Sequence, residues 1–301
     1  MIHSFYSTDH VPYYIFALDY IQQSAGIRAL HYLCHALNER GMEAYVTCEK
    51  TSPHLRTPVL NEVILKQHYE FGRVPIMVYP EIVSGDPMTA GGVVVRWLLN
   101  RPGHIGGDTF FPKNDLIFTY DENYLPDGWQ AEILHIPTCD LSIFNNKDNQ
   151  NDDSRDLVCY YAHKYLRNGG KLTGHVKDAI SLGKDQKLTH AEIAAILRRS
   201  RVLYVYEQTA LIAEALLCGC PVSVIDTDYW RNDASPYVAD WGVAYFDDSP
   251  ESLTLAKANV HNYQAMHQDL IDNAWIQLDR FIELTQGAAK TNQPSVASDR
   301  R

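Results

Sequence analysis

The sequence lacks any hydrophobic run that approaches the roughly 20 residues needed to span a bilayer. Its first residues, MIHSFYSTDHVPYY, also lack the charged region and apolar stretch of a secretory signal. Its six cysteines follow no disulfide framework spacing, which favours reduced thiols. We therefore expect a cytoplasmic protein, whose contact with the inner face of a membrane would be peripheral at most.

The sequence also has fewer positively charged residues than negatively charged ones. The 301 residues carry 26 Lys and Arg against 37 Asp and Glu, for a net charge of −11. We expect no nucleic-acid partner, because binding to phosphate backbones depends on clustered positive charge. The hydrophobic fraction of 46%, with 19 Tyr and 5 Trp, instead indicates a chain that can fold around sizeable cores and is long enough for two domains.

A complete metal-binding cluster is missing as well. The stretch HYLCH places His31, Cys34 and His35 on neighbouring turns of a predicted helix, the i, i+4 spacing of some metal sites. No second group of ligands is evident to complete a tetrahedral site. The competing interpretation is a helix with an apolar stripe toward the core and the histidines beside it. We expect no bound metal and no cofactor.

Strand-like and helix-like segments alternate along the chain, the pattern of an α/β protein with parallel sheets. In the first half, strands are predicted at 13–19, 43–48, 74–83, 115–122 and 131–137, with a helix over 27–41. In the second half, strands are predicted at 157–163, 202–206, 221–225 and 243–247, and helices over 189–200, 210–218 and 249–260. The helix signals are specific: Thr189 and Glu192 have the spacing of a capping box, and Ser249 precedes Pro250.

The polar stretch NNKDNQNDDSRD, residues 145–156, is the best linker in the chain. It divides the sequence into two predicted doubly wound, Rossmann-like domains, 1–145 and 146–264. An amphipathic helix over about 265–286 is expected to complete the first domain, because Trp275, Leu278 and Ile282 share one side. The small and polar residues 287–301 are expected to form a disordered tail.

The stretch VLYVYEQTALIAEALLCGCPVSVID, residues 202–226, carries the strongest functional signal. A strand ends at Tyr206, and Thr209 is a plausible N-cap for a helix that begins near Ala210. Ligands of open α/β sheets bind at this edge, where the free N–H groups of a first helical turn favour phosphate. Glu214 would lie over the same turn and could accept hydrogen bonds from ribose hydroxyls. The alternative is an ordinary strand–helix–strand unit with Glu214 facing solvent.

The segment YEQTALIAEALLCGCPVSVI resembles the donor-binding segment of GT-B glycosyltransferases, especially the retaining class called family 4. Glu214, Ala215, Gly219, Pro221 and Val222 match its pattern. The resemblance implies two Rossmann-like domains facing a cleft, ribose contact for Glu214, and phosphate contact for Thr209 and Ala210. The first glutamate of the family pattern falls on Tyr206, and Glu207 follows one place later as the candidate to face the donor sugar.

Other positions gain roles from the same resemblance. Lys164 and, more weakly, Lys171 in KYLRNGGKL would contact the diphosphate, although a lone lysine is usually a solvated surface charge. Ser24 and Gly26 would form a glycine loop near the acceptor, or a plain strand–helix turn. Glu81 is the candidate general base if the reaction inverts configuration. It could equally bind an acceptor hydroxyl or hold the following SGDP loop.

The sequence thus predicts a glycosyltransferase that moves a sugar from a nucleotide sugar to a glycan or lipid-linked glycan. The resemblance implies catalysis without metal and, as in family 4, retention of configuration. The DTD stretch at 226–228 is a minor alternative for a metal motif. Two further alternatives are a nucleotide-sugar epimerase of the same fold and a degenerate protein that binds nucleotide sugars without turnover.

Overall fold

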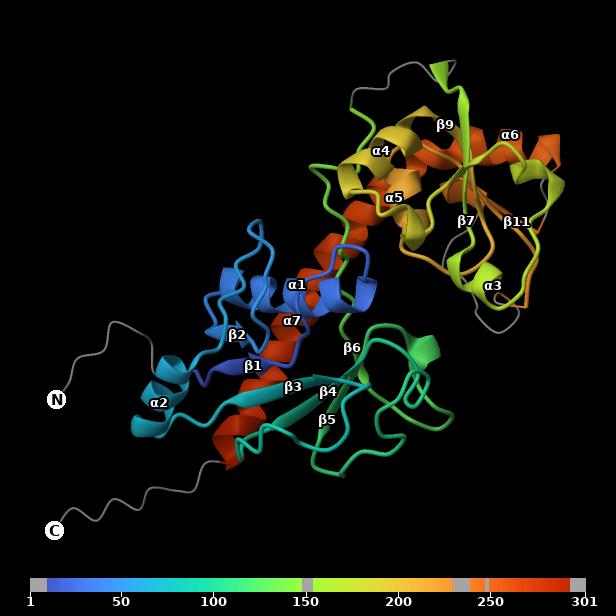
Figure 1. Cartoon of the computed structure of the whole chain (residues 1–301). Helices are drawn as coiled ribbons and strands as arrows, with labels where there is room; N and C mark the ends of the chain where they lie inside the picture. The colour runs from blue at the N-terminus through green and yellow to red at the C-terminus, as the bar shows by residue number, and fades with distance from the viewer. Residues whose placement is uncertain (1–9, 148–153, 229, 231–238, 247–248, 293–301) are drawn as a thin grey trace, which may run out of the picture. The chain divides into compact units, whose positions relative to one another are not determined.

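The computed structural model describes residues 10–147, 154–228, 230, 239–246 and 249–292 (Figure 1). The chain divides into two compact units, one of residues 1–138 with 271–301 and one of residues 139–270. The division falls before the stretch that the sequence indicates as a linker, of which 148–153 lie outside the described residues.

Unit 1 is built on a six-stranded sheet in which every pairing is parallel, in the order β2-β1-β3-β4-β5-β6. The strands are β1 (Tyr13–Ile15), β2 (Ala44–Val46), β3 (Ile76–Pro80), β4 (Val94–Leu98), β5 (Leu116–Thr119) and β6 (Glu132–Ile133). The helices are α1 (Ala25–Glu39), α2 (Glu62–Glu70) and the short η1 (Glu122–Tyr124). The sequence predicts most of these elements but not α2.

One face of this sheet packs against α1 and against the later part of α7 (Tyr263–Asn292). The apolar stripe of α1 is buried, and Gly41 ends the helix with a φ of +77°, a conformation that favours glycine. From α7, the fully buried Phe281 contacts Tyr13 and Phe118 with ring centroids 5.9 and 4.8 Å apart. Helix α7 continues through Asn292, so residues 287–292 are helical and the predicted disorder is wrong for them.

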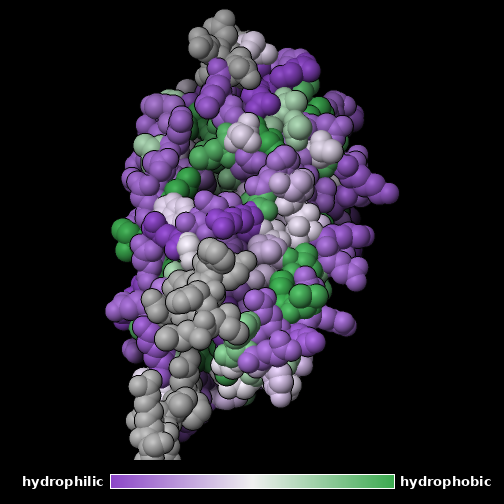
Figure 2. Space-filling view, turned by 90° about the vertical axis from the view of Figure 1, so that its left-hand side faces the viewer, coloured by the Kyte–Doolittle hydropathy of each residue, from purple (hydrophilic) through white to green (hydrophobic). Residues whose placement is uncertain are grey.

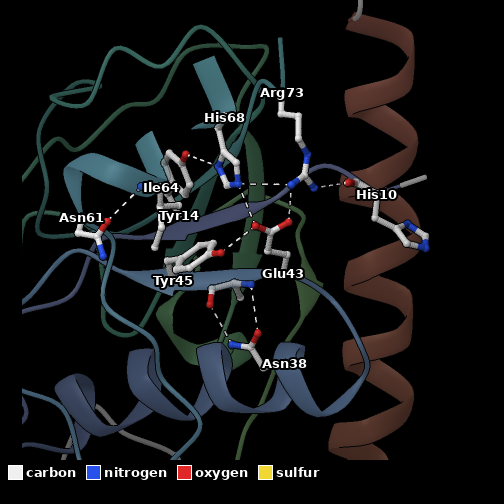
Figure 3. A network of polar contacts seen from close by, with 10 residues as sticks. His10, Tyr14, Asn38, Glu43, Tyr45, Asn61, Ile64, His68 and Arg73 are labelled. Carbon is white, nitrogen blue, oxygen red and sulfur yellow. Dashed lines mark hydrogen bonds and ion pairs between the residues drawn. The ribbon is translucent and has the colours of Figure 1, made fainter. Parts of the chain in front are cut away.

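A polar network lies at the amino end of the same sheet, where Glu43 precedes β2 (Figure 3). One Glu43 oxygen accepts from Nε2 of His68 at 2.8 Å and from the Tyr45 hydroxyl at 2.7 Å. The other oxygen accepts from Arg73 at 2.5 Å. The Tyr14 hydroxyl lies 2.6 Å from Nδ1 of His68. His68 is the buried residue of α2, so this network fixes the helix to the sheet.

Unit 2 is built on a five-stranded sheet, also with parallel pairings, in the order β11-β10-β9-β7-β8. The strands are β7 (Leu157–Tyr161), β8 (Ile180–Ser181), β9 (Ser200–Val205), β10 (Val222–Val224) and β11 (Val243–Tyr245). The helices are α3 (His163–Arg167), α4 (His190–Arg199), α5 (Leu211–Leu217), α6 (Pro250–Asn259) and the first turns of α7; the short turns are η3 (Gly174–Val176), η4 (Lys184–Gln186), η5 (Ala239–Trp241) and η6 (Val260–Asn262). Residues 164–167, predicted as part of a loop, are therefore helical, and so is His163, which was predicted to end the strand.

Local sequence signals explain several ends of these elements. The predicted capping box of α4 is confirmed: Thr189 Oγ1 accepts from the Glu192 amide, and Glu192 accepts from the Thr189 amide at 2.8 Å. Ser249 caps α6, with Pro250 as the first helical residue. The alternation along β9 places Leu203 and Val205 in one core and Tyr204 in another, because the strand is buried on both faces.

Hydrophilic residues predominate on the face that Figure 2 shows, with hydrophobic ones in small separate groups. Within the described part of the chain, no helix combines the length and apolar character that crossing a membrane requires.

Candidate functional site

The strand order of unit 2 reverses between β7 and β9. From β7 the chain adds β8 on one side, and it then returns to add β9, β10 and β11 on the other. Loops leave adjacent parallel strands in opposite directions at such a switch point, and ligands bind in the crevice outside the strand ends. The predicted donor residues Lys164, Tyr206 and Thr209 follow these two strands, so the topology brings the predicted segments to one edge.

The segment after β7, residues 162–173, is called the α3 loop here. Tyr165 covers Gly170 so closely that a Cβ at Gly170 would lie 2.5 Å from its ring. The Tyr165 hydroxyl donates to the Lys171 carbonyl at 3.1 Å. Lys164 and Lys171 are both exposed. Gly170 is therefore needed for the tyrosine to fold back over this part of the loop.

Two consecutive residues at the end of β9 hold the α3 loop. Tyr206 is fully buried, and its hydroxyl accepts from the Thr173 amide at 3.1 Å and lies 2.6 Å from Thr173 Oγ1. Its ring stacks on Tyr165 with centroids 5.2 Å apart. Glu207 is 1% exposed, and its Oε2 accepts from the Tyr165 amide at 2.6 Å. No local sequence signal predicts these contacts between Tyr206, Glu207 and the α3 loop.

Tyr161, which the sequence analysis did not single out, lies at the end of β7 beside the same carboxylate. Burial raises the pKa of Tyr161 to about 12; the Glu207 charge adds to this, and a hydrogen bond with Thr209 opposes it. Thr209 Oγ1 also accepts from the Leu211 amide at 3.3 Å. Ala210 occupies the N-cap position of α5, so the prediction of Thr209 as the N-cap is wrong by one residue.

Glu214 lies in the first turn of α5, as predicted, but its side chain does not face solvent. The residue is 2% exposed, and every residue of this seven-residue helix is buried. The alternative of a solvent-facing Glu214 is therefore wrong. The turn after the helix is also as predicted, since Gly219 has a φ of +70° and leads into β10.

Unit 1 has its own switch point between β1 and β3, and Glu81 follows β3 there. Glu81 is 3% exposed, and its Oε2 accepts from the Leu99 amide at 2.9 Å, just after β4. Burial raises the pKa of Glu81, while hydrogen bonds from the Leu99 and Asn100 amides oppose the rise. Glu81 thus holds the turn after β4, and Glu81 and Glu207 belong to different units.

Ser24 and Gly26, predicted either as a glycine loop near the acceptor or as a plain strand–helix turn, lie at the start of α1. Ser24 is the N-cap of α1 and makes no side-chain capping bond, and Gly26 lies inside the first turn. A Cβ at Gly26 would meet only the Leu99 side chain at 4.0 Å, an ordinary contact. The other protein segments leave the backbone at Gly26 open, so its role toward the acceptor stays a prediction.

The HYLCH residues lie along the flank of α1. His31 is fully buried with Nε2 3.0 Å from the Leu18 carbonyl, and His35 accepts from the Arg56 amide at 3.0 Å. Burial lowers the pKa of His31, against the opposing effects of the Leu18 contact and the Asp19 charge. Among the described residues, no group of three or more His, Cys, Asp or Glu side chains is placed to hold a metal ion.

No family model matches the sequence, and no curated protein matches it. A solved structure does share its fold. The crystal structure of glycosyltransferase VinC in complex with dTDP matches 91% of this chain and 100% of its own, with 12% identity and a TM-score of 0.50. Glycosyltransferase SnogD from Streptomyces nogalater matches 91% of this chain and 99% of its own, with 11% identity and a TM-score of 0.48. The likeness to the first concerns the fold: the chain has the GT-B fold of two Rossmann-like α/β domains with parallel sheets.

Proposed function

We propose that the chain is a glycosyltransferase that takes a sugar from a nucleotide-sugar donor bound to unit 2. The observation that carries this proposal is the switch point between β7 and β9, where the exposed Lys164 and the first turn of α5 follow adjacent strand ends. The GT-B fold that the chain shares with a dTDP-bound glycosyltransferase supports it.

The leaving group of this reaction is a nucleoside diphosphate, and its growing negative charge must be stabilised. We assign that role to Lys164, with Lys171 beside it, and to the backbone around Thr209 and Ala210. Glu214 would hold the donor ribose once the loop before α5 admits the nucleotide. The reaction we propose needs no metal, since these positive groups meet the diphosphate.

We further propose that the reaction retains configuration. Inversion needs a carboxylate base within hydrogen-bond reach of the acceptor hydroxyl. Glu81 is buried and accepts from the Leu99 amide, and Glu207 is buried and accepts from the Tyr165 amide. These contacts favour positioning over proton abstraction. We propose a glycan or lipid-linked glycan as acceptor, with the transfer taking place in the cytoplasm or at the inner membrane face.

The first experiment is a calorimetric and thermal-shift screen against UDP, TDP, GDP, ADP and their sugars, in EDTA. Saturation at 100 times Kd should stabilise the protein by about 2.7 kcal/mol. Glu214→Gln and Lys164→Ala should each weaken binding about tenfold. Glu192→Gln is the matched control, because this exposed glutamate caps α4 in the same unit.

The outcomes of this screen separate the alternatives. Transfer to an acceptor, with the anomeric configuration read by NMR, supports the proposal and tests retention. Conversion of the nucleotide sugar without acceptor identifies an epimerase, and binding without turnover identifies a degenerate binding protein. Binding that requires added Mg²⁺ or Mn²⁺ contradicts metal independence, and no binding under either condition overturns the proposed function.

A further inference from the structure

The Tyr206–Glu207 pair joins the two loops of the switch point. We propose that Glu207 is a positioning residue that, together with Tyr206, holds the α3 loop in the form that binds the donor diphosphate. The consequence for binding rests on the proposed function, whereas the hold on the loop does not.

Glu207 and Tyr206 contact opposite ends of the α3 loop. Glu207 fixes the loop near its start through the Tyr165 amide, at 2.6 Å. Tyr206 fixes its end through Thr173, with contacts of 3.1 and 2.6 Å. The pair thus holds both ends of the α3 loop from one neighbouring strand, and the two lysines lie between or beside the fixed points.

The Tyr165 side chain connects Tyr206 to the middle of the α3 loop. The Tyr165 ring stacks on Tyr206 and covers Gly170, and its hydroxyl donates to the Lys171 carbonyl. Movement of Tyr165 would therefore displace the whole loop. A loop held before the ligand arrives avoids part of the ordering cost of binding.

The Glu207 carboxylate is itself buried. Glu207 Oε1 is buried without a hydrogen-bond partner in the described structure, while Oε2 holds the Tyr165 amide. A buried unpaired polar atom is costly, and an apolar side chain would avoid that cost. A carboxylate here is best explained by the need for an acceptor oxygen at the first turn of α3, where its negative charge adds a smaller favourable contribution.

The first test is hydrogen exchange of the free protein. Glu207→Ala and Tyr206→Phe should each speed exchange of amides 163–173 at least tenfold, with the amides of β10 unchanged. Glu207→Gln, which keeps an acceptor oxygen, should restore most of the protection. Glu192→Gln should affect the start of α4 alone. The inference is overturned if exchange is unchanged at the Tyr165 amide in Glu207→Ala, or at the Thr173 amide in Tyr206→Phe. If Glu207→Ala does not fold, the result for Tyr206→Phe alone decides the test.

The second test is calorimetry with the nucleoside diphosphate that the wild type binds. Glu207→Ala should raise Kd at least tenfold, and Glu207→Gln should raise it about threefold or less. Because Glu207 acts through the loop that carries Lys164, the double variant with Lys164→Ala should bind within about threefold of Glu207→Ala alone. If the affinity losses of the two single variants multiply in the double variant, the two residues act independently, and that result contradicts a positioning role for Glu207. If the wild type binds no diphosphate, the proposed function fails, while the exchange experiment still decides whether the pair holds the loop.

Discussion

At the scale of single residues, Gly170 is needed because Tyr165 covers it. A Cβ at this position would lie 2.5 Å from the tyrosine ring, so Gly170→Ala should push Tyr165 off Tyr206. We expect a loss of about 1–3 kcal/mol in the free energy of unfolding and a marked loss of nucleotide binding. Gly174→Ala is the matched control, because a Cβ added at Gly174 would meet no other group within 4 Å. Equal effects of the two variants, measured by urea unfolding, would contradict the role of Gly170.

Glu81 should make stability fall as pH rises. Burial raises its pKa above the unfolded value, so its contribution is fully present below the unfolded pKa of about 4.3 and is lost as pH rises through the folded pKa. Glu81→Gln keeps an acceptor for the Leu99 amide without the charge. The variant should therefore show a flatter stability curve above pH 4 in urea unfolding series; an unchanged slope would show that Glu81 does not titrate with folding.

The residue scale also shows what could be predicted from the sequence. The place of Lys164 and Glu207 after neighbouring strands follows from alternating segments and parallel pairing, which are local and topological signals. The burial of Glu207 could not be predicted, because it depends on the Tyr165 amide 42 residues earlier. Sequence reasoning assigned its carboxylate to the sugar because side-chain type alone does not reveal its partners.

At the scale of elements, predictability follows the kind of signal. The start of α4 could be predicted, because a capping box is made within four residues. Helix α2 could not be predicted. Its buried residue is the polar His68, whereas the side chains of Val63 and Tyr69 are 75% and 87% exposed. Its hydrophobic pattern therefore points away from the core, and a polar network holds the helix instead.

That network should make α2 sensitive to acid. Burial raises the pKa of Glu43, but hydrogen bonds from His68, Tyr45 and Arg73 outweigh this and lower it to about 2. A depressed pKa gives stability that is present above the unfolded value and is lost as pH falls from about 4.5 toward 2. Because Glu43 is partly exposed, we expect this loss to be about 1–2 kcal/mol in the free energy of unfolding.

The measurement is hydrogen exchange of the α2 amides between pH 5 and 3, corrected for intrinsic rates. Wild type should lose protection in α2 as pH falls. Glu43→Gln should show low protection with little pH dependence. The control is the α1 amides, which lie on the other face of the sheet and should not follow the same curve. Loss of protection in both helices at the same pH would indicate global unfolding instead.

At the scale of the whole molecule, the two units have separate cores, and α7 contributes its later turns to unit 1. Phe281 is fully buried against Tyr13 and Phe118, so Phe281→Ala should cost about 3–5 kcal/mol. Because the cores are separate, the substitution should lower the stability of unit 1 and leave that of unit 2 unchanged.

Calorimetric unfolding tests this independence. Phe281→Ala should lower the transition of unit 1, identified by exchange of the β3 amides, and leave the transition of unit 2 in place. Ile276→Ala is the matched control, because Ile276 lies on the same helix and is 67% exposed. If both transitions fall together, the units unfold cooperatively, and nucleotide binding to unit 2 must then stabilise unit 1 as well.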